Sequence, residues 1–409
     1  MRFEFVEEKE RHYAKIKVIG VGGAGGNAID NMIRTNLRGV DFVVANTDCQ
    51  DLERSTCSYK IQIGPSTTMG LGSGSDPEIG KLSAEESIND IREAVENTDM
   101  VFITAGMGGG TGTGAGPVIA RECKANGALT VAVVTKPFKF EGERRMKRAM
   151  EGIEALKKEV DSVIVIPNER LKSLGSKSTT FRDLVARADE ILLHAVKGIS
   201  DLIISNGFIN LDFADIRKVM AEMGSAIMGM GRASGENRAT EAAQMAINSP
   251  LLENTSINGA KGLLMNITGP SDMTMDEIDA ASNLIKGEVN GDAEIFWGVV
   301  FDDTMGDEVQ MTVVATGIEG NGDGYRHNYS EAYSNVVKIR DVTPEEADEG
   351  WTVRMNGQSL DIPTFQRKGV EILGSEDERE ARDRKRGILS RFTMKGNLDY
   401  PTFLRTKAD

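Results

Sequence analysis

Residues 99–125 read DMVFITAGMGGGTGTGAGPVIARECKA, an apolar run, a glycine-rich loop and a helical segment in succession. The run VFITA predicts a buried strand, because near-continuous apolar side chains suit a strand that is covered on both faces. Glycines in loop 106–114 leave backbone N–H groups uncovered, so these can wrap a phosphate chain, and Thr111 and Thr113 add hydroxyl donors. Pro117 fits the first turn of the helix that follows. Direct flanking by strand and helix disfavours a flexible linker.

A second glycine-rich loop lies nearer the N-terminus. GVGGAGG (20–26) follows the strand-like KIKVIGV (15–21) and opens a helical segment. Glycine there lets the backbone approach a pyrophosphate, and the helix N-terminus favours the anion. This loop also fits the GxGxxG fingerprint of nicotinamide or flavin enzymes, although no acidic residue ends a second strand roughly 20 residues on. An NAD- or flavin-dependent oxidoreductase is therefore one alternative, which loop 106–114 opposes.

The order of strands and helices predicts the fold class. Strand-like runs at 41–48, 129–137 and 160–168 alternate with helical stretches such as 83–98. This alternation predicts an α/β, Rossmann-like domain with a parallel sheet over 15–180. Apolar residues at three- and four-residue spacing then predict a long central helix over 181–205. Residues 206–318 predict a smaller α+β domain, in which Thr274 and Glu277 form a capping box.

The two ends of the chain differ from its middle. Residues 1–14 form a charged extension without the apolar stretch of a signal peptide. Residues 319–409 form a polar linker and tail that we expect to be disordered. Within it LDIPTFQRK (360–368) and LDYPTFLRTK (398–407) share the repeat Leu-Asp-x-Pro-Thr-Phe-x-Arg, which is typical of a short peptide for a partner.

Composition excludes several classes of function. The formal net charge of −15 disfavours nucleic-acid binding, because an acidic surface repels phosphate backbones. No run approaches the roughly 18 apolar residues of a membrane span, so we expect no membrane insertion. The three cysteines and three histidines lack metal-ligand spacing. We therefore expect that these residues form no metal site. We also expect the cysteines to be reduced thiols in a cytoplasmic protein.

The stretch GGGTGTG (108–114) resembles the signature of the tubulin/FtsZ GTPase family, and the similarity to bacterial members extends over about residues 15–318. The Walker A pattern is absent, so the chain is not a P-loop nucleotidase. The resemblance implies that GTP and GDP are the ligands, with Mg²⁺. It implies nucleotide contacts at Gly22, Gly23, Ala24, Gly25, Asn27, Gly72, Gly108, Gly109, Gly110, Thr111, Gly112, Thr113, Gly114, Pro137, Glu141, Arg145, Asn168 and Asp189.

Asp189 is where the family reads the base. A carboxylate there can accept hydrogen bonds from guanine N1–H and the 2-amino group, a donor pair that adenine lacks. Taken alone, Asp189 would be an exposed helix carboxylate. Two positions depart from the family pattern. Val185 replaces the usual Phe, for which Phe181 is a candidate substitute, and Met69 replaces the usual Arg before Gly70–Gly74, a loop similar to the family's γ-phosphate-sensing loop.

The catalytic residues implied by the resemblance are Asn210, Asp212 and Asp215, in NGFINLDFAD (206–215). Taken alone, such a cluster is more often a helix N-cap. In the family these residues of one subunit orient water at the terminal phosphate held by the next. Activity then requires a head-to-tail homopolymer, which forms an open filament. A paralogue that binds nucleotide without hydrolysing it is a second alternative, which the intact residues oppose.

The resemblance also implies a biological setting. Members of this family form a ring at midcell in bacterial cytokinesis, and their terminal peptide docks on membrane-tethering division proteins such as FtsA. Here that peptide is 398–409, with Leu398, Pro401, Phe403 and Leu404 as apolar anchors. The copy at 360–367 either doubles the valency or is a decayed duplicate. The length of the chain and its tail peptide argue against identifying it as tubulin itself or as an archaeal relative with another role.

Overall fold

The computed structural model describes residues 14–172, 179–204, 212–221, 224–252, 257–289, 293–318, 354–355 and 358–359. The described residues up to 318 belong to one unit, and those at 354–359 belong to a second. In the second unit the described residues are two short antiparallel strands, Arg354–Met355 (β11) and Gln358–Ser359 (β12). Both copies of the tail repeat, and the disorder expected around them, lie outside the described residues.

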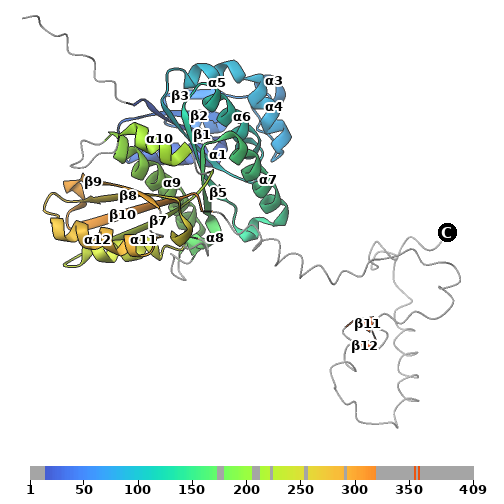
Figure 1. Ribbon diagram of the computed structural model, residues 1–409. Helices are drawn as coiled ribbons and strands as arrows, with labels where there is room; N and C mark the ends of the chain where they lie inside the picture. Colours follow the sequence, from blue (N-terminus) through green and yellow to red (C-terminus); the bar gives the residue numbers. More distant parts are fainter. Residues whose placement is uncertain are drawn as a thin grey trace, which may run out of the picture. The chain divides into compact units, whose positions relative to one another are not determined.

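Ten strands of the first unit form one sheet in the order β3-β2-β1-β4-β5-β6-β7-β10-β8-β9 (Figure 1). Its first six strands all pair in parallel. They are β1 (Ile16–Val21), β2 (Val40–Asn46), β3 (Tyr59–Gln62), β4 (Met100–Gly106), β5 (Leu129–Lys136) and β6 (Ser162–Pro167). The predicted parallel α/β domain is confirmed. The edge strand β3 was not predicted, because its four residues, YKIQ, carry little apolar signal.

Helices cover both faces of this parallel sheet, and each face has its own core. Their bounds are α1 (Gly22–Arg34), α2 (Cys49–Arg54), α3 (Pro65–Thr68), α4 (Pro77–Glu86), α5 (Ile88–Val95), α6 (Thr111–Ala125), η1 (Lys139–Glu141), α7 (Glu143–Glu159) and α8 (Asn168–Leu171). Along β1, Ile16 and Val18 pack in the core beneath α1, whereas Ile19 and Val21 pack in the core beneath α5, α6 and α7. Side chains alternate between the faces because successive residues of a strand point in opposite directions.

Two local predictions are wrong. The helix expected over 83–98 is interrupted at Ser87, whose hydroxyl accepts a hydrogen bond of 3.1 Å from the backbone N–H of Gly64. Pro117 does not lie in a first turn, because α6 already begins at Thr111 and contains Pro117 in its interior. The helix therefore starts within the glycine-rich loop itself, and the first helical residues are Thr-Gly-Thr-Gly.

The long helix is confirmed as α9 (Phe181–Ile204). It contacts α1 and β5 on one side and β8 and β9 on the other (Figure 1). The elements that follow are α10 (Phe213–Ala221), β7 (Gly224–Ser234), α11 (Arg238–Ile247), η3 (Ile257–Gly259), β8 (Gly262–Gly269), α12 (Met275–Gly287), β9 (Glu294–Phe301), η4 (Asp303–Met305) and β10 (Glu308–Thr316). The capping box is confirmed, since Thr274 and Glu277 each accept the other's backbone N–H.

The elements after α9 form a third core between α11, α12, β8 and β10. Strand β7 nevertheless joins the parallel part, because Ser162 to Ile164 of β6 pair with Gly224 to Ala226. The sheet is thus continuous across the boundary that the sequence suggested near residue 206. That boundary, like the other domain limits, stays a prediction.

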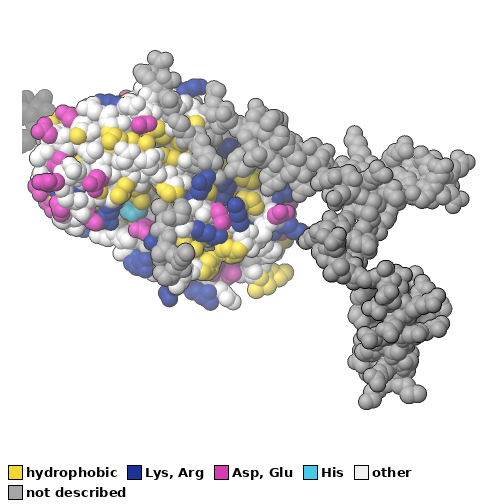
Figure 2. Space-filling model, turned by 90° about the horizontal axis from the view of Figure 1, so that it is seen from below, with side chains coloured by type: hydrophobic (Ala, Val, Ile, Leu, Met, Phe, Trp, Pro, Cys, Tyr) yellow, Lys and Arg dark blue, Asp and Glu magenta, His cyan; other side chains and the backbone are white. Residues whose placement is uncertain are grey.

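The surface carries charges of both signs. On the face shown in Figure 2, acidic and basic side chains both occur, with hydrophobic side chains between them. Nucleic-acid phosphates favour a continuous basic surface. No such surface covers the described part of the face shown in Figure 2. Among the described residues, no helix combines the length and the apolar character that crossing a membrane requires.

Candidate functional site

A cavity of about 720 Å³ lies at the carboxyl ends of the parallel strands. Five neighbouring strands each contribute a lining residue at the last position or directly after it: Val21, Asn46 and Gly106 end β1, β2 and β4, and Pro137 and Asn168 directly follow β5 and β6. Ligands of open α/β sheets bind at this edge, where the loops after the strands converge.

Most of the predicted nucleotide contacts meet in this cavity. It is lined by Gly22, Gly23, Ala24, Gly72, Gly109, Gly110, Thr111, Gly112, Pro137, Glu141, Arg145, Asn168 and Asp189. The structure brings together six segments that are far apart in the sequence, from the first glycine loop to α9. The contact of each residue with a nucleotide stays a prediction.

Five of the predicted residues do not line the cavity, and packing explains two of them. A Cβ atom on Gly25 would lie 2.5 Å from the carbonyl oxygen of Thr104, and one on Gly114 would lie 1.9 Å from that of Pro77. These glycines allow α1 and α6 to pack closely against their neighbours. Asn27 lines a separate, smaller cavity beside α9.

Gly108 and Thr113 are the other two. The Thr113 hydroxyl accepts a hydrogen bond of 2.8 Å from the Gly108 backbone N–H. This contact closes the glycine-rich loop onto the first turn of α6. Gly108 has φ +99°, and a Cβ atom there would lie 2.6 Å from the carbonyl oxygen of Arg145, so only glycine fits.

Two helices start at the cavity wall. Helix α1 begins at Gly22 and α6 at Thr111, and neither has a side-chain cap among the described residues. The first backbone N–H groups of a helix have no partner within it, and the helix dipole adds positive charge there. Two such starts side by side form a wall suited to phosphate groups.

Asn168 supplies an unsatisfied acceptor. It is the first residue of α8, and its side-chain oxygen Oδ1 is buried without a hydrogen-bond partner in the described part of the chain. A buried acceptor of this kind is costly unless a donor reaches it. A sugar hydroxyl is a donor of the right chemistry. Nearby, Arg145 and Glu141 form an ion pair of 3.1 Å one helical turn apart.

Asp189 faces the cavity from α9 and is partly buried. Burial raises the pKa of its carboxyl group to about 6, although the positive charge of Arg34 acts in the opposite direction. No described residue donates a hydrogen bond to this carboxylate. A ligand with a pair of N–H donors would satisfy it and favour the ionised form.

Three aromatic rings gather beside the cavity, at Phe138, Phe140 and Phe181. Phe138 and Phe140 are stacked with centroids 5.3 Å apart, and Phe181 packs edge-on against Phe140 at 5.6 Å. Phe181 and Phe140 are both well exposed. Phe181 thus lines the same cavity as Val185, one helical turn away, where it could supply an aromatic face.

Sequence reasoning missed the part of the site that follows β2. Asn46, Thr47 and Asp51 also line the cavity, and the Asn46 amide donates to Asp51 at 3.3 Å. The available signal was the polar run NTDCQD directly after the apolar residues FVVA. Polar side chains at the carboxyl end of a parallel strand lie at the same sheet edge as the glycine loops.

The predicted catalytic residues lie elsewhere. Asp212 precedes α10, and its backbone carbonyl accepts hydrogen bonds from the N–H groups of Asp215 and Ile216. Both carboxylates are exposed, and neither lines the cavity. Asn210 lies outside the described residues. No group of three or more His, Cys, Asp or Glu side chains in the described ranges is arranged to hold a metal ion.

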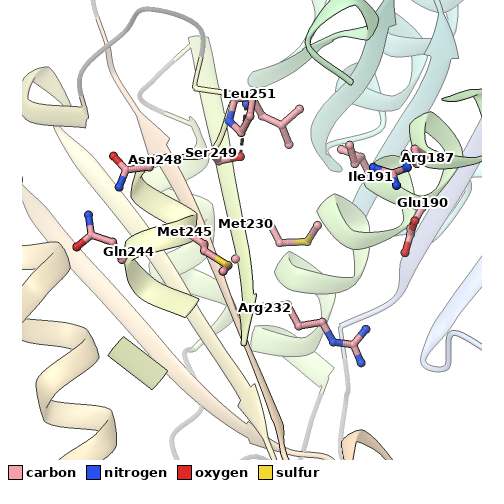
Figure 3. Close-up of a pocket in the computed structure, with 12 residues that line it drawn as sticks. Arg187, Glu190, Ile191, Met230, Arg232, Gln244, Met245, Asn248, Ser249 and Leu251 are labelled. Carbon is pink, nitrogen blue, oxygen red and sulfur yellow. Dashed lines mark hydrogen bonds between the residues drawn. The ribbon is translucent and has the colours of Figure 1, made fainter. Parts of the chain in front are cut away.

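A second cavity of about 540 Å³ lies between α9, β7 and α11 (Figure 3). Arg187, Glu190 and Ile191 of α9 lie on one side of it, and Met230 and Arg232 of β7 on another. No glycine-rich loop borders this cavity, and neither of the helix starts described above faces it. The 720 Å³ cavity is therefore the candidate site for a phosphate-bearing ligand.

Comparison with known proteins gives consistent results. The GTPase domain of the Tubulin/FtsZ family matches residues 15–176, and the C-terminal domain of the FtsZ family matches residues 224–319. The chain is 57% identical to the cell division protein FtsZ of Rickettsia felis over 363 residues, which cover 88% of this chain and 79% of that protein. It is 47% identical to FtsZ of a Wolbachia species, covering 87% and 96%.

A solved structure resembles the fold as well. An empty FtsZ dimer of M. jannaschii superposes with a TM-score of 0.73 at 44% identity, covering 76% of this chain and 90% of that one. The similarity therefore extends through the glycine-rich loops, the long helix and the elements after it.

Proposed function

This chain belongs to the tubulin/FtsZ family, in its FtsZ branch, and from that premise we propose that it hydrolyses GTP at a site completed by two adjacent subunits. It is a GTPase that polymerises in a GTP-dependent manner and acts in cell division. The observation that carries the proposal is that the nucleotide-binding residues and the catalytic carboxylates lie at separate places in the chain's structure. The nucleotide cavity holds uncapped helix starts and a base-reading carboxylate, whereas the exposed Asp212 and Asp215 lie outside it.

The phosphates lie on the starts of α1 and α6. Gly22 to Ala24 and Gly109 to Gly112 direct backbone N–H groups toward them, and the two helix dipoles stabilise their negative charge. Because the peptide groups are fixed before the ligand arrives, little reorganisation is needed as charge develops on the phosphoryl oxygens.

The nucleoside lies toward α8 and α9. Asp189 accepts from guanine, and the orphan oxygen of Asn168 accepts from a sugar hydroxyl. The aromatic rings of Phe140 and Phe181 cover the adjacent apolar surface. The Asp189 carboxylate receives no hydrogen bond from a described residue, so it favours a base with two N–H donors. Guanine has this donor pair and adenine does not, which favours GTP over ATP.

Hydrolysis needs a second copy. The following subunit places Asn210, Asp212 and Asp215 opposite the terminal phosphate, where they orient the attacking water. Exposure of Asp212 and Asp215 supports this arrangement, because carboxylates that act on a neighbouring subunit must be accessible. Met69 and Leu71 are 81% and 80% exposed beside the cavity and supply apolar surface for that contact.

Mg²⁺ fits this site as a companion of the phosphates. Such an ion keeps several waters and takes one or two carboxylates besides phosphate oxygens. Asp48 and Asp51 are carboxylates that line the cavity and can fill this role. When bound, the ion neutralises charge on the phosphates.

The partner and location follow from the same premise. We propose that 398–409 binds membrane-tethering division proteins such as FtsA, that 360–367 is a second binding copy, and that the filament acts at midcell. Both peptides lie outside the described residues, and their shared sequence supports the proposal. Deleting 398–409 should weaken partner binding only in part, whereas complete loss would refute a working second copy.

Turnover per molecule against protein concentration tests the shared site. With Mg²⁺ and GTP, we expect almost no turnover at high dilution and a rise above a threshold, accompanied by pelleting of filaments. Asp212→Ala should lose turnover while still binding GTP. A rate per molecule that is flat from high dilution would mean that each subunit is complete in itself.

Mixing two inactive variants sharpens this test. Asp212→Ala keeps an intact cavity, whereas Asp189→Ala keeps an intact catalytic loop. If the site is shared, mixed filaments contain complete sites and regain activity. Copolymers without any recovered turnover would refute the proposal.

A further inference from the structure

A groove of about 700 Å³ runs along one side of α9, and we call it the α9 groove. Residues of α9 between Ala186 and Ile204 line it, a stretch that is roughly 27 Å long at 1.5 Å per residue. The facing wall comes from the end of α1, the loop after it and β9. The α9 groove shares no lining residue with the 720 Å³ cavity, so it is a separate site. Its length suits an extended chain better than a compact ligand.

The groove is acidic toward the end of α9. Asp201 lines it there and forms no hydrogen bond or ion pair with a described residue. The carboxylate of Asp302 also lines the groove and lies 3.8 Å from the ammonium group of Lys197. A mostly buried carboxylate without a donor is costly in its ionised form, and a cation with several N–H donors would offset that cost.

The facing wall carries positive charge. Arg34, the last residue of α1, and Arg38, in the loop that follows, both line the groove, and neither forms an ion pair with a described residue. The Arg34 guanidinium group donates instead to the neutral side chain of Asn31 at 2.7 Å. Arg34 lies toward the start of α9, because it shares a smaller cavity with Ala186 and Asp189. These two guanidinium groups favour an acidic ligand group.

The neighbouring cavity joins this part of the groove. Glu190 of α9 and Arg232 of β7, both drawn in Figure 3, line the 540 Å³ cavity and the α9 groove alike. Both are already engaged, since Arg232 pairs with Glu308 and Glu190 lies 3.6 Å from the His194 ring nitrogen Nε2. Arg34 and Arg38 therefore remain the cations of the groove without a carboxylate partner among the described residues.

Apolar side chains lie between the two charged regions. Leu193 of α9 and Val300 of β9 both line the groove. The stretch of α9 from Asp189 to Asp201 is roughly 18 Å long at 1.5 Å per residue. An extended chain covers this distance in about five or six residues at 3.3 Å each. The groove thus matches a peptide in which apolar residues separate an acidic residue from a basic one by about that number of positions.

We propose that the α9 groove binds an extended peptide of a partner protein, whose arginine pairs with Asp201 and whose acidic residue pairs with Arg34 and Arg38. Arginine suits Asp201 better than lysine, because its planar guanidinium group can give two parallel hydrogen bonds to one carboxylate. Alternate side chains of an extended peptide point to the same side, so apolar residues at those positions cover Leu193 and Val300. This inference goes beyond the proposed function and requires no bound nucleotide.

Fluorescence anisotropy of labelled peptides with the full chain, at pH 7.5 and without nucleotide, tests the pairing. Two end-blocked probes bracket the span, Glu-Thr-Leu-Thr-Arg and Glu-Thr-Leu-Thr-Leu-Thr-Arg. We expect at least one of them to bind. Its affinity should fall by about tenfold when citrulline replaces the arginine or glutamine replaces the glutamate. Both replacements keep the side-chain shape and remove the charge.

Variants of the chain assign each charge to its partner. Asp201→Asn should weaken binding of the charged probe by about tenfold, and citrulline should then cost little more, because both changes remove the same pair. Glutamine in the probe should still cost about tenfold in this variant. Arg34→Gln should give the reverse pattern. Asp279→Asn, an exposed position on α12 outside the groove, is the matched control and should bind like the unmodified chain.

Three results would overturn the inference. Failure of both probes to bind the unmodified chain would exclude this ligand. Additive losses for Asp201→Asn and citrulline would show that Asp201 does not meet the arginine. Equal weakening by Asp279→Asn would reduce the effect to net charge. An unfolded variant is recognised separately, because it would lose the charged and the neutral probes alike and would show no cooperative melting.

Discussion

The hydroxyl of Thr113 accepts a hydrogen bond from the backbone N–H of Gly108, with 2.8 Å between the two atoms. The contact lies inside the glycine-rich loop and joins Gly108 to the first turn of α6. The glycines between them, Gly109, Gly110 and Gly112, line the cavity. Thr113 thus holds the loop in the shape that presents its N–H groups, rather than lining the cavity itself.

Removing this acceptor should loosen the loop. Thr113→Val keeps the side-chain shape but leaves the buried Gly108 N–H without its partner, which costs about 1–3 kcal/mol. We expect a lower unfolding temperature and GDP binding weakened by about tenfold. Thr113→Ser retains the hydroxyl and should bind GDP as the unmodified protein does. Calorimetric melting and equilibrium dialysis would measure both effects, and equal behaviour of the two variants would contradict this role.

Gly110 and Gly109 should respond differently to the same substitution. A Cβ atom on Gly110 would lie 2.3 Å from Ser73 Oγ and 2.7 Å from the backbone nitrogen of Asp76, whereas one on Gly109 meets no atom within 4 Å. Gly110→Ala should therefore destabilise the nucleotide-free protein by about 1–3 kcal/mol through overpacking. Gly109→Ala should leave its unfolding temperature unchanged. Indistinguishable melting curves for the two variants would contradict this prediction, because they would show that Ser73 and Asp76 can move to make room for the added methyl group.

Nucleotide binding should depend on pH through Asp189. Burial raises its pKa to about 6, so the carboxyl is mainly ionised at pH 7.5 and mainly protonated at pH 5. Because only the ionised form accepts both guanine donors, GDP affinity should fall by about tenfold from pH 7.5 to pH 5. Asp189→Asn should bind more weakly at pH 7.5 and lose this part of the pH dependence. A profile identical in both proteins would assign the titration to another group.

Asp201 on α9 should make stability depend on pH. Burial raises its pKa to about 6, with Lys197 opposing the shift and Asp302 adding to it. The folded state then binds this proton more tightly than the unfolded state, so stability falls as pH rises from about 4 to 6. Asp201→Asn should stabilise the protein by up to roughly 3 kcal/mol at pH 8 and have little effect near pH 4.

Urea unfolding at both pH values would measure this difference. Asp302→Asn serves as a comparison, because the pKa of Asp302 is lowered, chiefly by its hydrogen bond with the Thr304 side chain. Its carboxylate favours the folded state above the unfolded pKa, so that variant should lose stability at pH 8. Destabilisation by Asp201→Asn at pH 8 would show instead that the ionised carboxylate is stabilising.

Local sequence patterns were sufficient to predict the features that depend on neighbouring residues. Apolar runs predicted five parallel strands, a three- and four-residue spacing predicted α9, and two glycine runs predicted phosphate-binding loops. The family resemblance added Asp189 and Asn168, and the structure brings both to the cavity wall. These predictions succeed because strand, helix and loop propensities arise from residues close together in the chain.

The remaining features depend on contacts between distant parts of the chain. The break at Ser87 depends on the Gly64 N–H, a partner 23 residues away. The hydroxyl of Thr111 contacts the hydroxyls of Ser73 and Thr47, which are 38 and 64 positions away in the sequence. The raised pKa of Asp189 depends on how far α9 buries it, and the separation of Asp212 from the cavity depends on where α10 lies. Local patterns carry no information on such contacts, because the order of the strands in the sheet and the packing of the helices determine which distant residues meet.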